Sequence, residues 1–419
     1  MSVYQEFLDR KFKGFANRGV TAKTDSARLF PFQKTAADKL LGAGRGAAFL
    51  DTGMGKTAIQ VEWAKQLDVH TLILCPLAVA DQTIKEAAIM GVDVGRPGSD
   101  QLIEIVNYER MHRVDTSKYA AVVFDESSIM KSLQSKTREM AERSFSHCEY
   151  RLACSATPAP NDYLEIGQQS QVLGILRSID MLSRWFVNDS ANTGTWRLKR
   201  HAQGDFWRWV ASWAVVASCP ADLGDNETDL SLPPLIENES MVGSPPHDAA
   251  ESLFGDIELS ATGIRRAKKA SLNNRMARCF DLADGDDYAL VWCHTNDEAD
   301  ALKAIPGAVE VRGNMTLEEK ESRLSAFSRG DERVLVTKPT IAGFGLNWQH
   351  CNNVIQSGAD YSFERYYQAI RRCWRFGQKR PVTASVVMTP DERLIWLKVR
   401  EKSEKHETMQ NEVRRWNLI

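Results

Sequence analysis

The chain has 419 residues, of which 43% are hydrophobic and 26% are charged, a composition typical of globular proteins with little disorder. This length is sufficient for two or three domains, and no apolar run approaches the roughly 20 residues that span a bilayer. The first ten residues contain Glu6 and Asp9 and lack the apolar core of a secretion signal, so we expect a cytoplasmic protein. Because the formal net charge is −2, contacts with phosphates must come from local basic patches.

The eight cysteines are scattered along the chain and include no Cys-x-x-Cys pair. The histidines also show no zinc-ligand spacing. We therefore expect reduced, mostly buried thiols rather than disulfides or a zinc site.

The first half of the chain alternates short apolar runs with longer amphipathic ones, which is typical of a parallel sheet flanked by helices. This pattern predicts an α/β domain. Its expected strands are 47–50, 71–75, 102–106, 121–124 and 150–154, and its expected helices are 57–66 and 79–90.

A second α/β series follows the proline-containing stretch 230–247, for which we expect irregular structure. We therefore divide the chain into an N-terminal domain, residues 1–235, and a C-terminal domain, residues 236–419. A long charged helix is expected over 391–416. The expected strands of the second domain are 289–293, 308–311, 333–337, 353–356 and 382–389, and its helices are 297–304, 317–328 and 363–374.

The strand rhythm is interrupted at about residues 163–220, where tryptophans crowd together. We expect a helical extension of the first domain whose aromatic rings form a core. A platform on which nucleic-acid bases stack is the alternative. The tryptophans concerned are Trp185, Trp196, Trp207, Trp209 and Trp213.

A phosphate-binding loop is predicted at residues 51–57, between an apolar strand and a helix. Its glycines let backbone N–H groups close on phosphates, while Lys56 can reach the terminal phosphates and Thr57 can ligate Mg²⁺. The general pattern has glycine where Leu50 stands, so the match is incomplete. The residues expected to bind ATP here are Gly53, Met54, Gly55, Lys56 and Thr57.

Two adjacent carboxylates, Asp125 and Glu126, follow the apolar strand 121–124. In nucleotide-hydrolysing folds one carboxylate at this position binds Mg²⁺, and a second can orient the attacking water. We assign Asp125 to the metal and Glu126 to the water. Capping of the following helix is the alternative role, which the upstream phosphate loop makes less attractive.

Six further segments surround these two motifs in a fixed order. The first half contains Leu-Phe-Pro-Phe-Gln at 29–33, Cys-Pro-Leu-Ala-Val at 75–79, Asn-Tyr-Glu-Arg at 107–110 and Ser-Ala-Thr-Pro at 155–158. The second half contains Ala-Gly-Phe-Gly-Leu-Asn at 342–347 and Gln-Ala-Ile-Arg-Arg-Cys-Trp-Arg-Phe-Gly-Gln at 368–378. In this order the segments resemble the motifs of the Swi/Snf-type ATPases of helicase superfamily two, and the departures resemble compact phage or bacterial members.

The resemblance implies two tandem RecA-like domains with ATP bound between them. It makes Gln33 the residue that reads adenine and adds Gly345 to the nucleotide site. It also implies that Ser155, Thr157 and Gln368 couple hydrolysis to movement.

Arg372 and Arg375 stand three residues apart on a predicted helix and are therefore expected to share a face. If that face looks across the cleft between the domains, both guanidinium groups can meet the γ-phosphate. An arginine finger of this kind is worth roughly 10³–10⁵ in rate. We expect Arg375 to be the finger and Arg372 its partner; pairing with surface acids such as Glu364 is the alternative.

The resemblance also implies contacts with the DNA backbone, which position a protein without reading bases. Carried over residue by residue, these contacts fall on Val79, Asn107, Tyr108, His294, Thr295, Arg312, Gly313 and Thr340. Of these we take Asn107, Tyr108, Arg312 and Thr340 as the predicted DNA contacts.

Three functions follow as hypotheses. The first is a DNA-dependent ATPase, using ATP and Mg²⁺, that translocates on double-stranded DNA or remodels branched DNA in a bacterial or phage-infected cell. The second is a strand-separating or branch-migrating helicase of replication, recombination or defence, with residues 185–213 as its wedge. The third is an ATP-gated DNA clamp with slow hydrolysis, against which the complete set of predicted catalytic residues argues.

Overall fold

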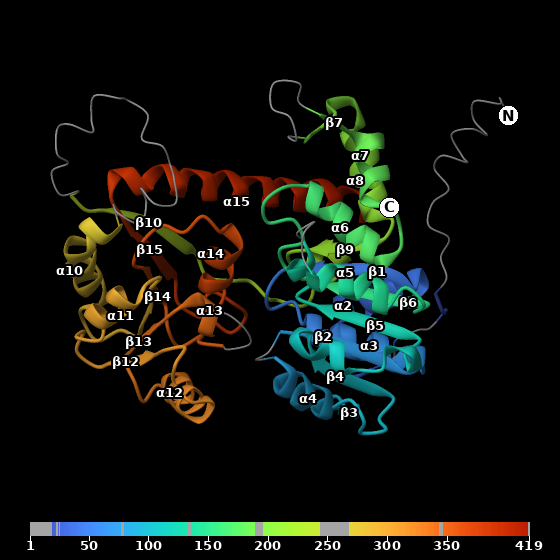
Figure 1. Cartoon of the computed structure of the whole chain (residues 1–419), viewed down its shortest axis with the longest axis horizontal. Helices are drawn as coiled ribbons and strands as arrows, with labels where there is room; N and C mark the ends of the chain where they lie inside the picture. Colours follow the sequence, from blue (N-terminus) through green and yellow to red (C-terminus); the bar gives the residue numbers. More distant parts are fainter. Residues whose placement is uncertain are drawn as a thin grey trace. The chain divides into compact units, whose positions relative to one another are not determined.

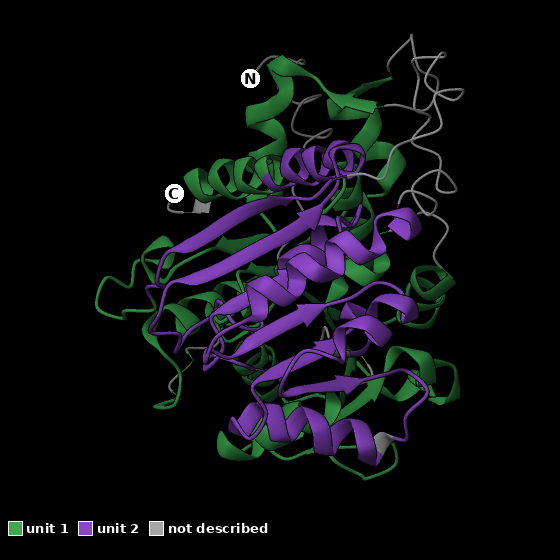
Figure 2. Ribbon diagram, turned by 90° about the vertical axis from the view of Figure 1, so that its left-hand side faces the viewer, with its two compact units in different colours: residues 1–230, 404–419 green, residues 231–403 purple. Residues whose placement is uncertain are grey.

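The computed structural model describes residues 19–21, 24, 26–76, 79–131, 136–188, 196–243, 268–342 and 347–417. Two compact units can be distinguished (Figure 2). Unit 1 comprises residues 1–230 and 404–419, and unit 2 comprises residues 231–403. The sequence-based division at residues 235 and 236 stays a prediction.

Unit 1 is built on a seven-stranded sheet in the order β3-β4-β2-β5-β6-β1-β9, and its strand pairs are all parallel (Figure 1). Because the strands are buried on both faces, they read as continuous apolar runs rather than alternating ones. The strands are β1 (Arg45–Leu50), β2 (Thr71–Cys75), β3 (Val94–Gly95), β4 (Ile103–Asn107), β5 (Ala121–Asp125), β6 (Tyr150–Cys154) and β9 (Ala214–Ala217).

Helices cover both faces of this sheet, because successive strand side chains point to opposite sides. In β1, Ala48 and Leu50 pack against α2 (Pro31–Ala43) and α3 (Lys56–Leu67). Ala47 and Phe49 belong to a second core on the opposite face. The other helices flanking the sheet are α4 (Ala80–Ile89), α5 (Lys136–Ser144) and α6 (Leu164–Leu173).

The tryptophan-rich extension is folded as expected around its own aromatic core. It contains α7 (Ser178–Trp185), α8 (Gln203–Ala211) and an antiparallel hairpin of β7 (Phe186–Asn188) and β8 (Trp196–Leu198). Trp185, Trp207 and Trp213 are only 2–4% exposed. These three rings are core components and leave no face on which a base could stack.

Unit 2 contains a six-stranded sheet in the order β10-β15-β14-β11-β13-β12, again with parallel pairs. The expected α/β class with two helix-flanked parallel sheets is thereby confirmed. The strands are β10 (Leu235–Met241), β11 (Ala289–Trp292), β12 (Ala308–Val311), β13 (Val334–Thr337), β14 (Asn353–Gln356) and β15 (Val382–Met388).

The helices of unit 2 begin where the sequence provides N-terminal caps. Thr295 and Thr316 each accept a hydrogen bond from the backbone N–H three residues later, and Glu298 and Glu319 reciprocate. The helices are α10 (Leu272–Ala283), α11 (Asn296–Leu302), α12 (Leu317–Arg329), α13 (Pro339–Ala342), α14 (Phe363–Ile370) and α15 (Pro390–Asn417), the last of which passes into unit 1 at Glu404.

The structure corrects two sequence-based expectations. The stretch 230–247 contains β10, because its prolines flank the strand at 233–234 and 245–246 rather than interrupt it, and β10 occupies a sheet edge. Helix α14 ends at Ile370, so Arg372 and Arg375 lie in the turns beyond it. No helix within the described residues is long and apolar enough to cross a membrane.

Candidate functional site

The candidate site of unit 1 lies at the carboxyl edge of three neighbouring strands. β5, β6 and β1 are adjacent and parallel, so their carboxyl ends meet at one edge of the sheet. Asp125 is the last residue of β5, Ser155 follows β6, and the loop 51–55 follows β1. Three segments up to about a hundred residues apart are thereby brought together, at the edge where α/β proteins bind ligands.

The loop after β1 has the backbone conformation that a phosphate cradle requires. Gly53 and Gly55 adopt φ values of 89° and 74°, in the left-handed region that favours glycine. Lys56 begins α3, and its Nζ donates hydrogen bonds to the carbonyl oxygens of Leu50 at 2.9 Å and Asp51 at 3.3 Å. The side chain of Lys56 is thus folded along the loop that it follows.

Gln33 of α2 packs directly against this loop, which is where the resemblance places an adenine-reading residue. Its Nε2 donates to the carbonyl oxygen of Met54 at 3.3 Å, and its Oε1 accepts from the N–H of Phe30 at 3.0 Å. A Cβ atom at Gly55 would lie 2.1 Å from this Nε2. Gly55 is therefore required both by its φ and by the approach of Gln33.

The ionisable groups of the site are perturbed by burial. Burial lowers the pKa of Lys56, opposed by the carboxylates of Glu126, Asp51 and Asp125. Burial and then the neighbouring charge of Glu126 raise the pKa of Asp125 to about 7, while Lys56 opposes the rise. Such shifts are typical of functional sites, and a bound cation would favour the charged carboxylate.

Glu126 is held in an unusual conformation by two hydroxyl groups. Its φ of 52° is left-handed, which is rare for a residue with a side chain and common at functional sites. Ser128 Oγ and Ser155 Oγ each donate a 2.9 Å hydrogen bond to Glu126 Oε1. Ser155 Oγ in turn accepts from the N–H of Thr157 at 3.1 Å, so the Ser-Ala-Thr segment is connected directly to the carboxylate.

Two supporting residues were missed by the sequence analysis. Ser128 stands two residues after Glu126 and had no role assigned from the sequence. Gln169 of α6 is fully buried and donates from Nε2 to the carbonyl oxygen of Ser127 at 3.1 Å. Nothing in the sequence around Gln169 signals this contact, because 42 residues separate the partners.

The residues present fit a magnesium ion that also binds substrate phosphates. Mg²⁺ usually keeps several waters and takes one or two protein oxygens, and Thr57 and Asp125 supply a hydroxyl and a carboxylate. Gly53 and Gly55 have left-handed backbone conformations, and the loop leads directly into the N-terminus of α3. Backbone N–H groups at a helix N-terminus bind phosphates favourably. No cluster of three or more His, Cys, Asp or Glu side chains suited to a metal occurs among the described residues.

Two of the residues predicted to contact DNA have internal partners. Asn107 is 4% exposed, and its Nδ2 donates to the carbonyl oxygen of Pro76 at 3.1 Å. Tyr108 is also 4% exposed, and its hydroxyl donates to the carbonyl oxygen of Asp125 at 2.9 Å. The side chain of Asn107 thus supports the segment after β2, and that of Tyr108 supports the end of β5.

The other two residues predicted to contact DNA lie in unit 2. The guanidinium group of Arg312 forms ion pairs with Glu310 and Asp300, and both raise the pKa of Arg312. Thr340 is exposed on the short helix α13. Of these two residues, Thr340 presents the more open side chain.

The arginine-rich segment after α14 is folded into turns within unit 2. The carbonyl oxygen of Arg372 accepts from the N–H of Trp348 at 2.8 Å, which takes the backbone out of the helical path. Arg375 donates to the side chain of Asn347, so the two predicted motifs of unit 2 are in contact. Gln368 is 8% exposed at the end of α14, whereas Gly345 lies outside the described residues.

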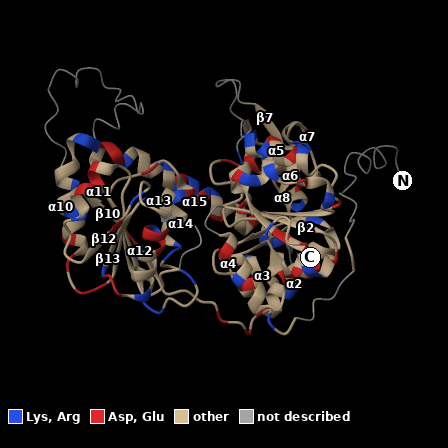
Figure 3. Cartoon of the chain, turned by 60° about the horizontal axis from the view of Figure 1, so that its bottom comes forward, with Lys and Arg blue, Asp and Glu red and all other residues tan. Residues whose placement is uncertain are grey.

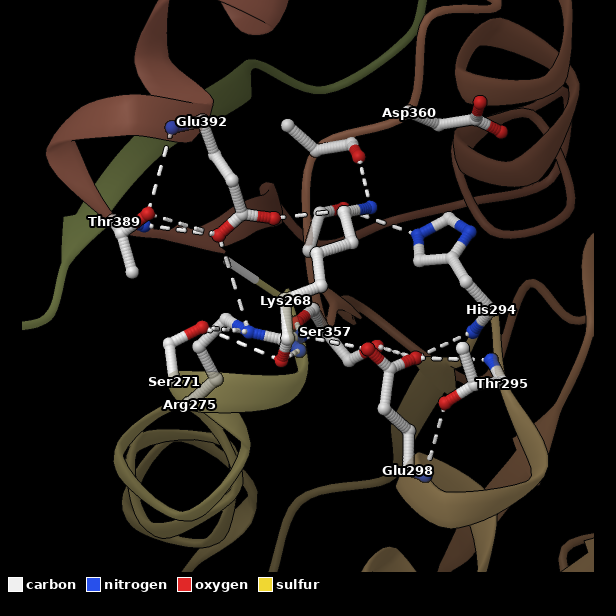
Figure 4. Close-up of polar contacts among 12 residues, drawn as sticks. Lys268, Ser271, Arg275, His294, Thr295, Glu298, Ser357, Asp360, Thr389 and Glu392 are labelled. Carbon is white, nitrogen blue, oxygen red and sulfur yellow. Dashed lines mark hydrogen bonds and ion pairs between the residues drawn. The ribbon is translucent and has the colours of Figure 1, made fainter. Parts of the chain in front are cut away.

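A buried charge network lies at the carboxyl edge of the unit 2 sheet (Figure 4). The carboxylate of Glu298 accepts from Arg275 Nη1 at 2.7 Å, from the N–H of His294 at 2.7 Å and from Ser357 Oγ at 3.0 Å. Arg275 and Glu298 are both 1% exposed or less. The network therefore fixes the turn after β11 to the segment after β14.

A second carboxylate completes this network from α15. Glu392 lies 3.9 Å from Arg275 Nε and 3.7 Å from Lys268 Nζ, and Lys268 also donates to the carbonyl oxygen of Ala359 at 2.5 Å. Although burial raises the pKa of Glu298, the charges of His294 and Arg275 outweigh it and hold this pKa at about 2. Burial and then Lys268 lower the pKa of His294, whose Nε2 contacts the Gly358 carbonyl oxygen at 3.1 Å.

Comparison with known proteins gives a family match within the second unit. Residues 272–377 match the family model of the helicase conserved C-terminal domain. Eukaryotic initiation factor 4A of Dictyostelium discoideum is 30% identical over 112 residues, which are 26% of this chain and 27% of that protein. The chain thus spans about a quarter of the length of that relative.

A solved structure is similar to this chain over most of its length, at low sequence identity. The Sulfolobus solfataricus SWI2/SNF2 ATPase core in complex with double-stranded DNA is 17% identical and has a TM-score of 0.42. The comparison covers 93% of this chain and 94% of that one.

Proposed function

We propose that the chain is a superfamily-two helicase that hydrolyses ATP and couples hydrolysis to translocation on double-stranded DNA, which the match of residues 272–377 to the helicase conserved C-terminal domain supports. The observation that carries the proposal is the meeting of the Gly53–Thr57 loop, Asp125, Glu126 and Ser155 at one sheet edge. The order of the sequence motifs supports a Swi/Snf-type ATPase.

The loop and the start of α3 bind the phosphates of ATP in this proposal. Backbone N–H groups and the helix dipole favour the anion, and Lys56 turns from the loop carbonyls toward the terminal phosphates. Thr57 and Asp125 would hold Mg²⁺, which neutralises charge on the β- and γ-phosphates when it is bound. Gln33, beside the loop, contacts the adenine.

Glu126 orients the water that attacks the γ-phosphate. Its two serine hydroxyl partners restrict the carboxylate to one orientation, which lowers the entropic part of the barrier. Arg375 supplies the finger and Arg372 supports it. The contact from Thr157 through Ser155 to Glu126 gives movement of the Ser-Ala-Thr segment a route to the reacting water.

Steady-state ATP hydrolysis measured without nucleic acid and with single-stranded DNA, duplex DNA or RNA tests this function. We expect duplex DNA to stimulate turnover most and Glu126→Gln to reduce turnover by roughly 10²–10⁴-fold while ATP still binds. Absence of stimulation by duplex DNA would contradict the proposal. Turnover that survives Glu126→Gln would contradict the catalytic assignment.

A further inference from the structure

A cluster of cations lies on the tryptophan-rich extension, far in sequence from the helicase motifs. Residues 177–208 contain six Lys and Arg residues against three Asp residues, a net charge of +3 in a chain whose total is −2. Figure 3 marks Lys and Arg positions in blue beside β7 and α7. The extension is therefore a local exception to the nearly neutral chain.

The fold of the hairpin directs aromatic side chains inward and a cation outward. Phe186, Trp196 and Leu198 pack in or against the core of the extension. Because successive strand residues point to opposite faces, Arg197 lies on the other face, opposite the exposed Val187. Arg200 lies two residues after the end of β8 and is also exposed.

Two acids in the described part of the extension each form an ion pair with one cation. Asp180 pairs with Arg177, and Asp205 pairs with Arg208. Lys199 donates from Nζ to two backbone carbonyl oxygens at the end of α7, at 3.3 Å and 3.1 Å. These contacts hold β8 and the residues after it against α7 without cancelling charge.

Three arginines have no ion-pair partner within the described residues. Arg197 and Arg200 form none, and Arg184 lies 5.8 Å from the ring centre of Trp185 and interacts electrostatically with Asp180, whose ion pair is with Arg177. Guanidinium groups are weakly hydrated and match the geometry of phosphate oxygens. This set, Arg184, Arg197 and Arg200, is called the hairpin arginines below.

We propose that the hairpin arginines bind the sugar-phosphate backbone of duplex DNA and form a binding surface additional to the helicase motifs. The inference rests on the proposed function, which supplies a polyanion as the track. It also supplies phosphate-binding groups that the predicted DNA contacts do not offer in this structure. Asn107 and Tyr108 have internal partners, and Arg312 is paired with two acids. Contacts with phosphates and sugars alone would anchor the duplex without sequence preference.

The test measures the affinity of the full chain for a fluorescent duplex as a function of salt concentration. Each phosphate contact contributes about −0.9 to the slope of log affinity against log salt. Arg184→Ala/Arg197→Ala/Arg200→Ala should therefore reduce the slope by up to about 2.7 and weaken binding roughly 10- to 100-fold near 0.1 M salt. ATP turnover at saturating duplex should be unchanged, because these residues lie outside the catalytic site.

Two controls separate the surface from general effects of charge and folding. Replacing the hairpin arginines by lysine keeps the charge and should retain most of the slope. Lys85→Ala/Arg143→Ala/Lys398→Ala removes the same charge from exposed positions on α4, α5 and α15 and should change the slope by less than about 1. Circular dichroism of each variant reports on folding.

Three outcomes would overturn the inference. The first is an unchanged affinity and slope in the alanine variant, which would also leave an acidic protein as the better partner for this surface. The second is an equal loss in the α4, α5 and α15 control, which would reduce the effect to net charge. The third applies if the triple alanine variant does not fold: the single variant Arg197→Ala would then show an unchanged affinity for the duplex and an unchanged salt slope. Failure of the proposed function would look different, since duplex DNA would then not stimulate the unmodified chain.

Discussion

Replacement of Arg275 by methionine tests whether the buried network of unit 2 depends on its central cation. Methionine fills a similar volume but leaves the carboxylate of Glu298 buried without its closest cation. Removing one partner of a buried ion pair costs about 3–5 kcal/mol. The pKa of Glu298 gives a similar size, because a fall from 4.5 to about 2 corresponds to about 3 kcal/mol of stabilisation at neutral pH.

The dependence of this loss on pH follows from the direction of the pKa shift. In the unmodified chain the folded-state pKa of Glu298 is depressed, so its contribution is present above about pH 4.5 and is lost as pH falls through about 2. Without Arg275, burial is opposed by less positive charge, so this pKa rises and protonation of Glu298 relieves part of the destabilisation. The deficit of Arg275→Met should therefore be largest near pH 8 and should shrink toward pH 5.

Urea unfolding, followed by hydrogen exchange of peptides from β11 and β14, measures the free energy of unfolding of unit 2 separately. Arg278→Met is the matched control on the same helix, because its ion pair with Asp281 is exposed and such pairs contribute at most about 1 kcal/mol. A loss below about 1 kcal/mol for Arg275→Met at pH 8 would refute the reasoning. A deficit that does not shrink at pH 5 would also refute it.

Three further substitutions test the nucleotide site. Ser155→Ala removes one of the two hydroxyl contacts to Glu126 and should slow ATP turnover about tenfold with little change in ATP affinity, which pre-steady-state and binding measurements separate. Gly55→Ala places a methyl group 2.1 Å from Gln33 Nε2, at a residue whose φ of 74° disfavours any side chain. ATP affinity, measured by titration with a fluorescent nucleotide, should therefore fall at least about tenfold. Unchanged affinity would show that the loop does not bind ATP as described. Arg375→Ala should reduce ATP turnover by roughly 10³-fold or more. Arg380→Ala, which removes an exposed ion pair with Asp287, is the control and should leave turnover nearly unchanged. Equal effects of the two substitutions would contradict the assignment of Arg375 as the arginine finger.

Periodicity predicted most of the sheet strands, because buried parallel strands are continuous apolar runs between polar turns. The predicted bounds of β2, β6, β12 and β14 coincide with those in the structure. β10 escaped prediction because its exposed residues alternate poorly and prolines flank it. α14 was extended too far because nothing local shows that Trp348 captures the carbonyl oxygen of Arg372.

The candidate site was predictable where it consists of short contiguous motifs. The loop 53–57 and the pair Asp125 and Glu126 each follow a recognisable strand, and parallel topology then brings them together. The orientation of Glu126 depends on Ser155 and on the backbone support of Gln169, contacts that only folding creates. The network around Arg275 was likewise invisible, because its members are single residues spread from 268 to 392.

The most direct test of the account is displacement of a third DNA strand from a duplex. A translocating ATPase should release the triplex-forming strand when ATP is supplied and leave the underlying duplex paired, and Glu126→Gln should release none. ATP hydrolysis stimulated by duplex DNA without any release would contradict translocation. Separation of the duplex strands in the same assay would instead support the strand-separating helicase.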